Sequence, residues 1–265
     1  GAPRAANAPV ALNGSLKIEE TRAVPGISAK LNTIAKIRGE YVIASKYDFW
    51  FLNADLSPKF HAAMDPWFSA NVLDLVGITA LDKDAYVLMG SNKSLLRVRQ
   101  NPEADDVQGW PNFTAGRSHI EAVGGLGRAR IDTERAKFSY IHSSATDGRY
   151  VFMATVPDNK NKKQFVISKA LMKDWMLSGE FVPTAEMLKK DRSLGELYVT
   201  GMVYEDGKLY AVSKNWNVLV VIDVAQEAVV EAWGLPEELT DIRGLVKDGS
   251  TFEVIDANRV VKLTM

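Results

Sequence analysis

The chain has 265 residues, of which 46% are hydrophobic and 25% are charged, and its formal net charge is −1. This composition fits a globular protein with one large core or two smaller ones, and the balanced charge argues against a general affinity for nucleic acid or an anionic membrane. The chain has no cysteine, which excludes thiolate catalysis, disulfides and cysteine-ligated metal sites and favours an oxidising compartment, although many cytosolic proteins also lack cysteine.

The first residues, GAPRAANAPVALNG, are rich in Ala, Pro and Asn. They have neither the charged start nor the apolar centre of a signal peptide, and no run in the chain approaches the roughly 20 apolar residues that span a bilayer. We expect a flexible linker over residues 1–14, left after processing or after a domain was cut from a longer protein, and a single domain over residues 15–265. Either origin suggests a functional unit that extends upstream of Gly1.

Five stretches of similar design follow along the chain, each with alternating β-formers on both sides of a polar tip. They are Glu40 to Leu56 around SKYD, Ala85 to Val98 around GSNKS, Arg149 to Leu171 around PDNKNKK, Lys208 to Asp223 around KNWN, and the shorter Ser250 to Leu263. This pattern predicts five hairpins. One more strand and a turn precede each hairpin: LNTIAKIRGE, LVGITALDKD, FSYIHSSATDG, VTGMVYEDG and IRGLVKDG. A fourth-strand candidate follows the first four: PKFHAAMD, DVQGWPNF, WMLSGEFVP and AVVEAWGLP.

The repeat predicts an all-β fold, a five-bladed β-propeller closed by an N-terminal strand. Its anchors, Tyr41, Tyr86, Tyr150, Leu209 and Phe252, are spaced by 45, 64, 59 and 43 residues, and the shorter spacings match a four-stranded blade of about 40–45 residues. The last unit has only three strands, while the strand-like segment Ser15 to Val24 has no unit of its own. We expect that segment to complete the last blade, because an open edge invites aggregation. A pair of β-sandwiches or a six-stranded barrel is the alternative.

Two insertions account for the longer spacings. Gly116 to Lys137 has too few β-branched residues for a sixth blade, so we expect a loop or short helix there. Pro183 to Glu196 has the pattern of a short capped helix, with Thr184 as N-cap, Glu186 in the first turn, and Lys189 and Lys190 late.

Polar residues at the start of the innermost strands are candidates for the central funnel of the propeller. They are Asn32, Asp74, His142, Tyr198 and Asp241, with Arg243 beside Asp241. Two carboxylates in a funnel can serve acid–base chemistry or hold calcium, but an Asp before a strand is also ordinary turn chemistry. The three histidines show no metal-ligand spacing, so we expect neither a metal nor another cofactor.

Aromatic residues near strand ends are the second group of candidates, because propeller loops commonly bind partners. The best of them is Trp216, which stands with Asn215 at the tip KNWN, followed by Tyr47, Trp50 and Trp67. Packing between blades is the plain alternative for most aromatics. The glycine-rich VGGLGRAR, Val123 to Arg130, is only a fragment of a phosphate-binding motif and indicates a surface loop.

Blades such as LYAVSKNWNVLVVID resemble those of bacterial extracytoplasmic propellers of the YncE and SdiA-regulated kind. IASKYDFWFLNADL, MDPWFSANVLDLVGI and VLMGSNKSLL, within residues 40–97, together resemble the periplasmic propeller of DsbI-type, DsbB-related disulfide bond formation proteins. The redox residues of that family are cysteines of its membrane domain, and none of them has a counterpart here. The resemblance implies a periplasmic appendage tethered to the inner membrane.

We therefore expect a non-catalytic interaction or scaffold domain. Its expected partners are an exported protein and, in a longer chain, an upstream membrane domain, and nucleic acid is not expected. The alternative is a periplasmic propeller hydrolase or lactonase that uses Asp74 and Asp241 around a divalent ion in the funnel.

Overall fold

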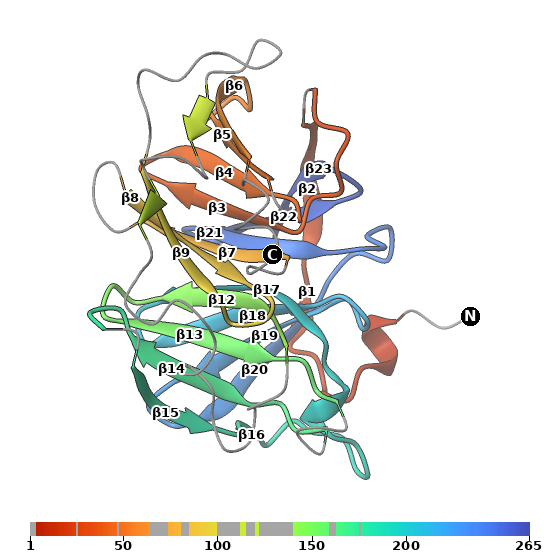
Figure 1. The fold of residues 1–265 in the computed structure, drawn as a ribbon. Helices are drawn as coiled ribbons and strands as arrows, with labels where there is room; N and C mark the ends of the chain where they lie inside the picture. Colours follow the sequence, from red (N-terminus) through yellow and green to blue (C-terminus); the bar gives the residue numbers. More distant parts are fainter. Residues whose placement is uncertain are drawn as a thin grey trace.

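The structure is a computed structural model (Figure 1). It describes residues 4–24, 26–46, 48–63, 74–80, 85–99, 112–114, 120–121, 140–158, 163–174 and 176–265. These residues form five sheets, and strands that follow one another in the chain are neighbours in each sheet. No helix in these ranges is long and apolar enough to cross a membrane.

The strands of the five sheets follow the chain order from the innermost strand outward. The first sheet contains β3 (Thr33–Ile37), β4 (Glu40–Ala44), β5 (Asp48–Leu52) and β6 (Pro58–Ala63). The second contains β7 (Leu75–Ala80), β8 (Ala85–Gly90), β9 (Leu95–Arg99) and the short β11 (Ile120–Glu121). The third contains β12 (Ile141–Thr146), β13 (Tyr150–Thr155), β14 (Ile167–Leu171) and β15 (Leu177–Phe181).

The last two sheets are completed by strands from elsewhere in the chain. The fourth sheet contains β17 (Val199–Glu205), β18 (Lys208–Ser213), β19 (Val218–Asp223) and β20 (Ala228–Gly234), with β1 (Gly14–Ser15) and β16 (Thr184–Ala185) parallel to β20. The fifth contains β21 (Arg243–Asp248), β22 (Thr251–Asp256), β23 (Arg259–Thr264) and, antiparallel to β23, β2 (Lys17–Ala23).

The innermost strands form a closed ring. β3 contacts β7, β7 contacts β12, β12 contacts β17, β17 contacts β21, and β21 contacts β3. The ring surrounds a cavity of about 680 Å³ that all five strands line. The all-β fold and the propeller-like arrangement of sheets predicted from the repeat are therefore confirmed.

Four of the sheets are complete blades, with an outer antiparallel strand of five to seven residues. The sheet of β7 to β9 differs, because its fourth strand is only the two-residue β11. Most of DVQGWPNF, the predicted fourth strand of this unit, lies outside the described residues. Its last part was assigned to the wrong sheet, since β10 (Asn112–Thr114) pairs with β6. A short parallel pairing of this kind leaves no periodicity in the sequence.

The predicted closure by the N-terminal strand is confirmed, because β2 is the outer strand of the last sheet. A polar network reinforces it. The buried Glu253 carboxylate accepts hydrogen bonds from the Tyr41 hydroxyl at 2.6 Å and from Nη2 of Arg22, a β2 residue, at 3.0 Å. Burial raises the pKa of Tyr41, as does the bond to Glu253. The network joins the N-terminal strand to the first and last sheets.

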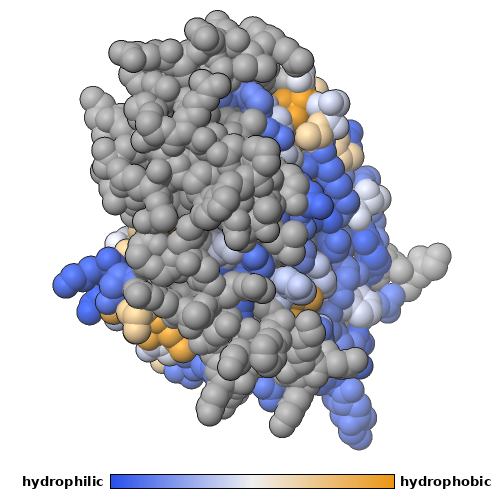
Figure 2. All heavy atoms as spheres, viewed as in Figure 1, coloured by the Kyte–Doolittle hydropathy of each residue, from blue (hydrophilic) through white to orange (hydrophobic). Residues whose placement is uncertain are grey.

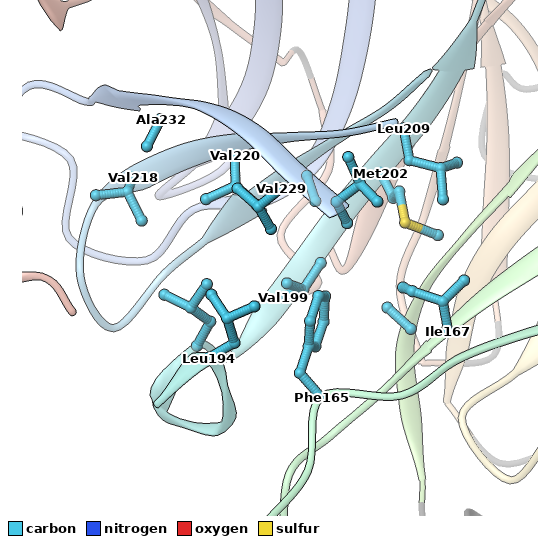
Figure 3. Packing of buried hydrophobic residues seen from close by; sticks show 14 of the residues in the cluster. Phe165, Ile167, Leu194, Val199, Met202, Leu209, Val218, Val220, Val229 and Ala232 are labelled. Atoms are coloured by element: carbon cyan, nitrogen blue, oxygen red, sulfur yellow. The ribbon is translucent and has the colours of Figure 1, made fainter. Parts of the chain in front are cut away.

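The apolar core lies between neighbouring sheets. Figure 3 shows Phe165 and Ile167, from the third sheet and its approach, close to Val199 and Met202 of the fourth. The described residues visible on the face in Figure 2 are mainly hydrophilic. This division follows the alternation of apolar and polar residues along the strands.

The predicted flexible linker is wrong for the described residues from Arg4 onward. Ala5, Ala8 and Val10 are buried and belong to the same core cluster as the fourth sheet. Val10 forms a β-bridge with Leu188, and the Lys189 amide donates to the Pro9 carbonyl at 2.8 Å. Small residues gave this segment the composition of a linker, but their size also lets the backbone lie close to the sheet.

The helix predicted over Pro183 to Glu196 is also wrong. Thr184 belongs to β16 and caps no helix. The segment contains only a short 3-10 helix, η3 (Leu194–Glu196), whose capping box is formed by Ser193 and Glu196. Pairing with β20 and the contact with residues 9–11 take the backbone groups that a helix would have used. The other insertion, residues 116–137, lies outside the described residues except for β11.

A β-bulge recurs near the start of the innermost strand in four sheets. The register shifts between Leu75 and Gly77, Ile141 and Ser143, Val199 and Gly201, and Arg243 and Val246. A bulge re-aims side chains and bends the strand. Beyond it, glycines let neighbouring innermost strands approach closely: a Cβ on Gly201 would lie 2.6 Å from the Gly244 carbonyl oxygen.

We predict that Gly201→Ala destabilises the fold by roughly 3 kcal/mol, because the added methyl meets the backbone of the adjacent sheet. Gly234→Ala is the matched control on the outer strand β20, where the nearest atoms belong to the Leu12 and Ser15 side chains, at 3.2 Å. Those side chains can rotate away, so we expect a loss below about 1 kcal/mol. Urea unfolding measures both values. Equal losses in the two variants would contradict the close approach of β17 and β21.

Candidate functional site

Polar side chains from the starts of the innermost strands of the third, fourth and fifth sheets meet two lysines from other segments, Lys30 before β3 and Lys214 after β18. We call this cluster the funnel mouth and define it by six residues: Lys30, His142, Tyr198, Lys214, Asp241 and Arg243. Residues that follow them on the same strands, such as Ser143, Gly201 and Leu245, line the central cavity. None of the six mouth residues lines this cavity itself, and Lys30 and Asp241 line a separate cavity of about 400 Å³.

Asp241 is the centre of the charged part of the mouth. Its carboxylate accepts hydrogen bonds from Nε of Arg243, at 3.2 and 3.3 Å to the two oxygens. The ammonium groups of Lys30 and Lys214 lie 3.3 and 3.8 Å from the same carboxylate. Burial favours a raised pKa for Asp241, but Arg243 and Lys30 outweigh it and hold this pKa below its ordinary value. Three cationic groups thus surround one ionised carboxylate.

His142 and Tyr198 form the less polar wall of the mouth. His142 stands in the bulge between Ile141 and Ser143, and its ring lies 5.2 Å from the ring of Tyr198. The Lys214 ammonium lies 5.0 Å from the centre of the Tyr198 ring, within range of a cation–π contact. These contacts join the third and fourth sheets at the funnel mouth.

Burial and positive charge set the protonation of this wall. Burial, with the charges of Arg243 and Lys214, lowers the pKa of His142 to about 4. Burial raises the pKa of Tyr198, and Arg243 only partly offsets this. Burial and then the Arg243 charge lower the pKa of Lys214. At neutral pH the mouth therefore contains an uncharged imidazole, a protonated phenol and a surplus of positive charge.

The funnel residues predicted from the sequence are largely brought together. His142, Tyr198, Asp241 and Arg243 are in the mouth, and the charge of Asp74 acts on His142 and favours its protonation. Asn32 directly precedes β3, and its backbone N–H donates a hydrogen bond to the Ala44 carbonyl at 2.7 Å.

The aromatic candidates have contacts within the fold, and none of these contacts tests a binding role. The Trp216 indole donates to the Glu196 carbonyl at 3.2 Å, and Arg192 lies over its ring. The Asn215 side chain accepts from the Tyr198 amide at 3.0 Å and so helps to position Tyr198. Trp50 is buried and stacks on His61. Tyr47 and Trp67 lie outside the described residues.

Sequence reasoning missed Lys214 and Lys30. A signal for Lys214 exists in the repeat, because a Ser-Lys pair stands where the second strand gives way to the turn in two units, in ASKYD and VSKNW. In each case the lysine faces the aspartate that precedes the innermost strand of the next sheet: Lys46 lies 4.0 Å from Asp74, and Lys214 lies 3.8 Å from Asp241. The repeated pair places a cation beside each funnel aspartate.

The mouth is chemically suited to binding an anion. Its cations disfavour the binding of a divalent metal ion at Asp241 by charge repulsion, because that carboxylate already interacts with Arg243, Lys30 and Lys214. No group of three His, Asp or Glu side chains with metal-ligand geometry occurs within the described ranges. What the mouth offers is hydrogen-bond donors and positive charge.

We predict that the His142 imidazole remains neutral in the folded protein down to about pH 4, whereas an unfolded histidine takes up a proton near pH 6.5. The unfolded state then binds more protons between these values, so stability falls as the pH drops through this window, by up to about 3 kcal/mol. NMR titration of the imidazole measures the pKa, and Arg243→Gln should raise it by removing the nearby charge. A midpoint near 6.5 that Arg243→Gln leaves unchanged would contradict the buried, positive setting.

Comparisons with known proteins agree with the fold and go no further. No family model matches the chain, and no curated protein is similar to it in sequence. The glutaminyl cyclase of Myxococcus xanthus is similar in structure, with a TM-score of 0.62, 11% identity and 97% coverage of both chains. The PQQ-bound aldose sugar dehydrogenase of Streptomyces coelicolor is also similar, with a TM-score of 0.55 and 11% identity over 94% of this chain and 98% of that one. A luciferin-regenerating enzyme has a TM-score of 0.53 and 10% identity over 93% of this chain and 95% of that one. At these identities the likeness establishes a β-propeller fold alone.

Proposed function

We propose that this chain is a non-catalytic binding propeller that takes its ligand at the funnel mouth and serves as an interaction domain. One observation carries the proposal: donors and cations from three sheets converge at the funnel mouth, where Lys30 and Asp241 line a cavity of about 400 Å³. Concave sites with a few convergent polar groups are the usual form of a ligand site. A rigid ring of strands suits such a role, because it holds the groups in place without a ligand.

The proposal includes five blades. The innermost strands of all five sheets contribute to the ring, which supports counting the sheet of β7 to β9 as a blade despite its two-residue outer strand.

We further propose that the domain acts outside the cytoplasm, as the periplasmic part of a membrane-tethered disulfide bond formation protein, with an exported protein as its partner. The lack of cysteine and the resemblance within residues 40–97 support this setting. Cell fractionation with an antibody against the domain tests it. We expect a carbonate-resistant membrane band well above 29.2 kDa. A soluble band near that mass would contradict the tether.

The alternative, a hydrolase or lactonase with a divalent ion, has less support from the geometry. The structural neighbours include enzymes by name, but their identity of 10 or 11% carries no chemistry to this chain. The ion would have to bind beside Arg243 and Lys214, at a carboxylate that both already contact. Positive charge at such short range opposes it.

We predict that a thermal-shift screen of sugars, amines, organic acids and divalent ions finds a compound that stabilises the wild-type protein through the mouth. Preferential binding to the folded state raises the melting temperature. Arg243→Gln should abolish the shift. Arg149→Gln should keep it, because Arg149 is exposed in the hairpin between β12 and β13, beyond the other end of β12.

Recovery of the compound tests the non-catalytic part of the proposal. Mass spectrometry should return it unchanged after incubation with the protein. Conversion by the wild type and not by Arg243→Gln would contradict a binding role, as would stabilisation by calcium that Asp241→Asn removes. A screen without any stabilising compound would also contradict it.

A further inference from the structure

The free donors of the funnel mouth point to the chemical class of the ligand. Resting on the proposed binding function, we infer that the mouth recognises the carboxylate of a small organic acid, held by the guanidinium of Arg243 and the ammonium of Lys214, with the carbon skeleton against the rings of His142 and Tyr198.

Arg243 provides the first argument. Its side chain is only 14% exposed, and its hydrogen bonds to other described residues use Nε alone, on Asp241. The two Nη groups, with four N–H donors, have no hydrogen-bond partner within the described part of the chain. Asp241 fixes the guanidinium and leaves this pair of donors available. A carboxylate accepts two parallel hydrogen bonds from such a pair.

The charge at the mouth provides the second argument. Lys30, Lys214 and Arg243 face the single carboxylate of Asp241, and the adjacent His142 is uncharged at neutral pH. Asp74, the other nearby acid, has its own cation in Lys46. The surplus of positive charge is therefore local, although the whole chain is nearly neutral. An incoming anion would restore the balance in a site partly removed from water.

The wall formed by His142 and Tyr198 distinguishes an organic acid from an inorganic anion. Both rings are partly buried, lie 5.2 Å apart and carry no charge at neutral pH. They provide an apolar surface with a polar edge, which suits a carbon skeleton better than a fully hydrated phosphate.

Isothermal titration calorimetry at low ionic strength tests the inference with defined probes: succinate, benzoate, their amides succinamide and benzamide, and inorganic phosphate. We expect at least one acid to bind, its amide to bind at least tenfold more weakly, and phosphate to bind more weakly than the acid. Arg243→Gln should weaken binding at least tenfold and Lys214→Gln about threefold. Arg149→Gln and Lys208→Gln should leave the affinity unchanged. Each removes one cation from a hairpin that follows an innermost strand, at the end away from the mouth.

Lys214→Gln keeps the test decisive if Arg243→Gln fails to fold, because Lys214 lies at a hairpin tip and, among the described residues, forms an ion pair with Asp241 alone. Equal affinity for acid and amide, preference for phosphate, or binding that neither variant weakens would overturn the inference. A neutral compound that binds at the mouth would overturn it and leave the proposed binding function intact. An organic acid that binds at the mouth and is then converted would support the inference and contradict the proposed non-catalytic function.

Discussion

Glycine stands where the innermost strands approach one another, and the rest of the molecule depends on that approach. Gly201 packs against the backbone of Gly244, and a Cβ on Gly244 would in turn lie 2.6 Å from the Ile34 amide nitrogen. Gly244 also has a φ of +72°, which glycine adopts without strain. These contacts join the fourth sheet to the fifth and the fifth to the first. They set the width of the ring and hence the volume of the central cavity.

The closure of the ring also builds the funnel mouth. After β2 completes the last sheet, residues 24–32 lead to β3 and bring Lys30 to Asp241 at 3.3 Å. Asn258 fixes this crossing, because its side chain accepts from the Leu31 amide at 3.1 Å and donates to the Ala29 carbonyl at 2.6 Å. The same chain path therefore closes the fold and supplies a cation to the site. Stability and binding share these residues.

Much of the fold follows from sequence pattern. Strand alternation and turn residues located every hairpin of the repeat, and the unfilled edge of the last unit identified β2 as its missing strand. The failures have a common cause. Residues 4–13 and the Pro183 to Glu196 segment are held by pairing with distant strands, as in the Val10 to Leu188 bridge. Local composition contains no information about such partners.

The candidate site was predictable in part for the same reason. The starts of the innermost strands meet at one end of any propeller, so His142, Tyr198 and Arg243 could be named in advance. Their electrostatic character could not, because it depends on Lys214 and Lys30 arriving from a hairpin tip and from the closing segment. The two funnel aspartates named from the sequence each lie beside a lysine, Lys46 at Asp74 and Lys214 at Asp241.

A crystal structure of the protein with a bound organic acid tests the central claim most directly. The account predicts a carboxylate in bidentate contact with the Nη groups of Arg243, near Lys214, with its skeleton against the rings of His142 and Tyr198. An acid bound elsewhere, or a metal ion on Asp241 with Arg243 turned away, would contradict it.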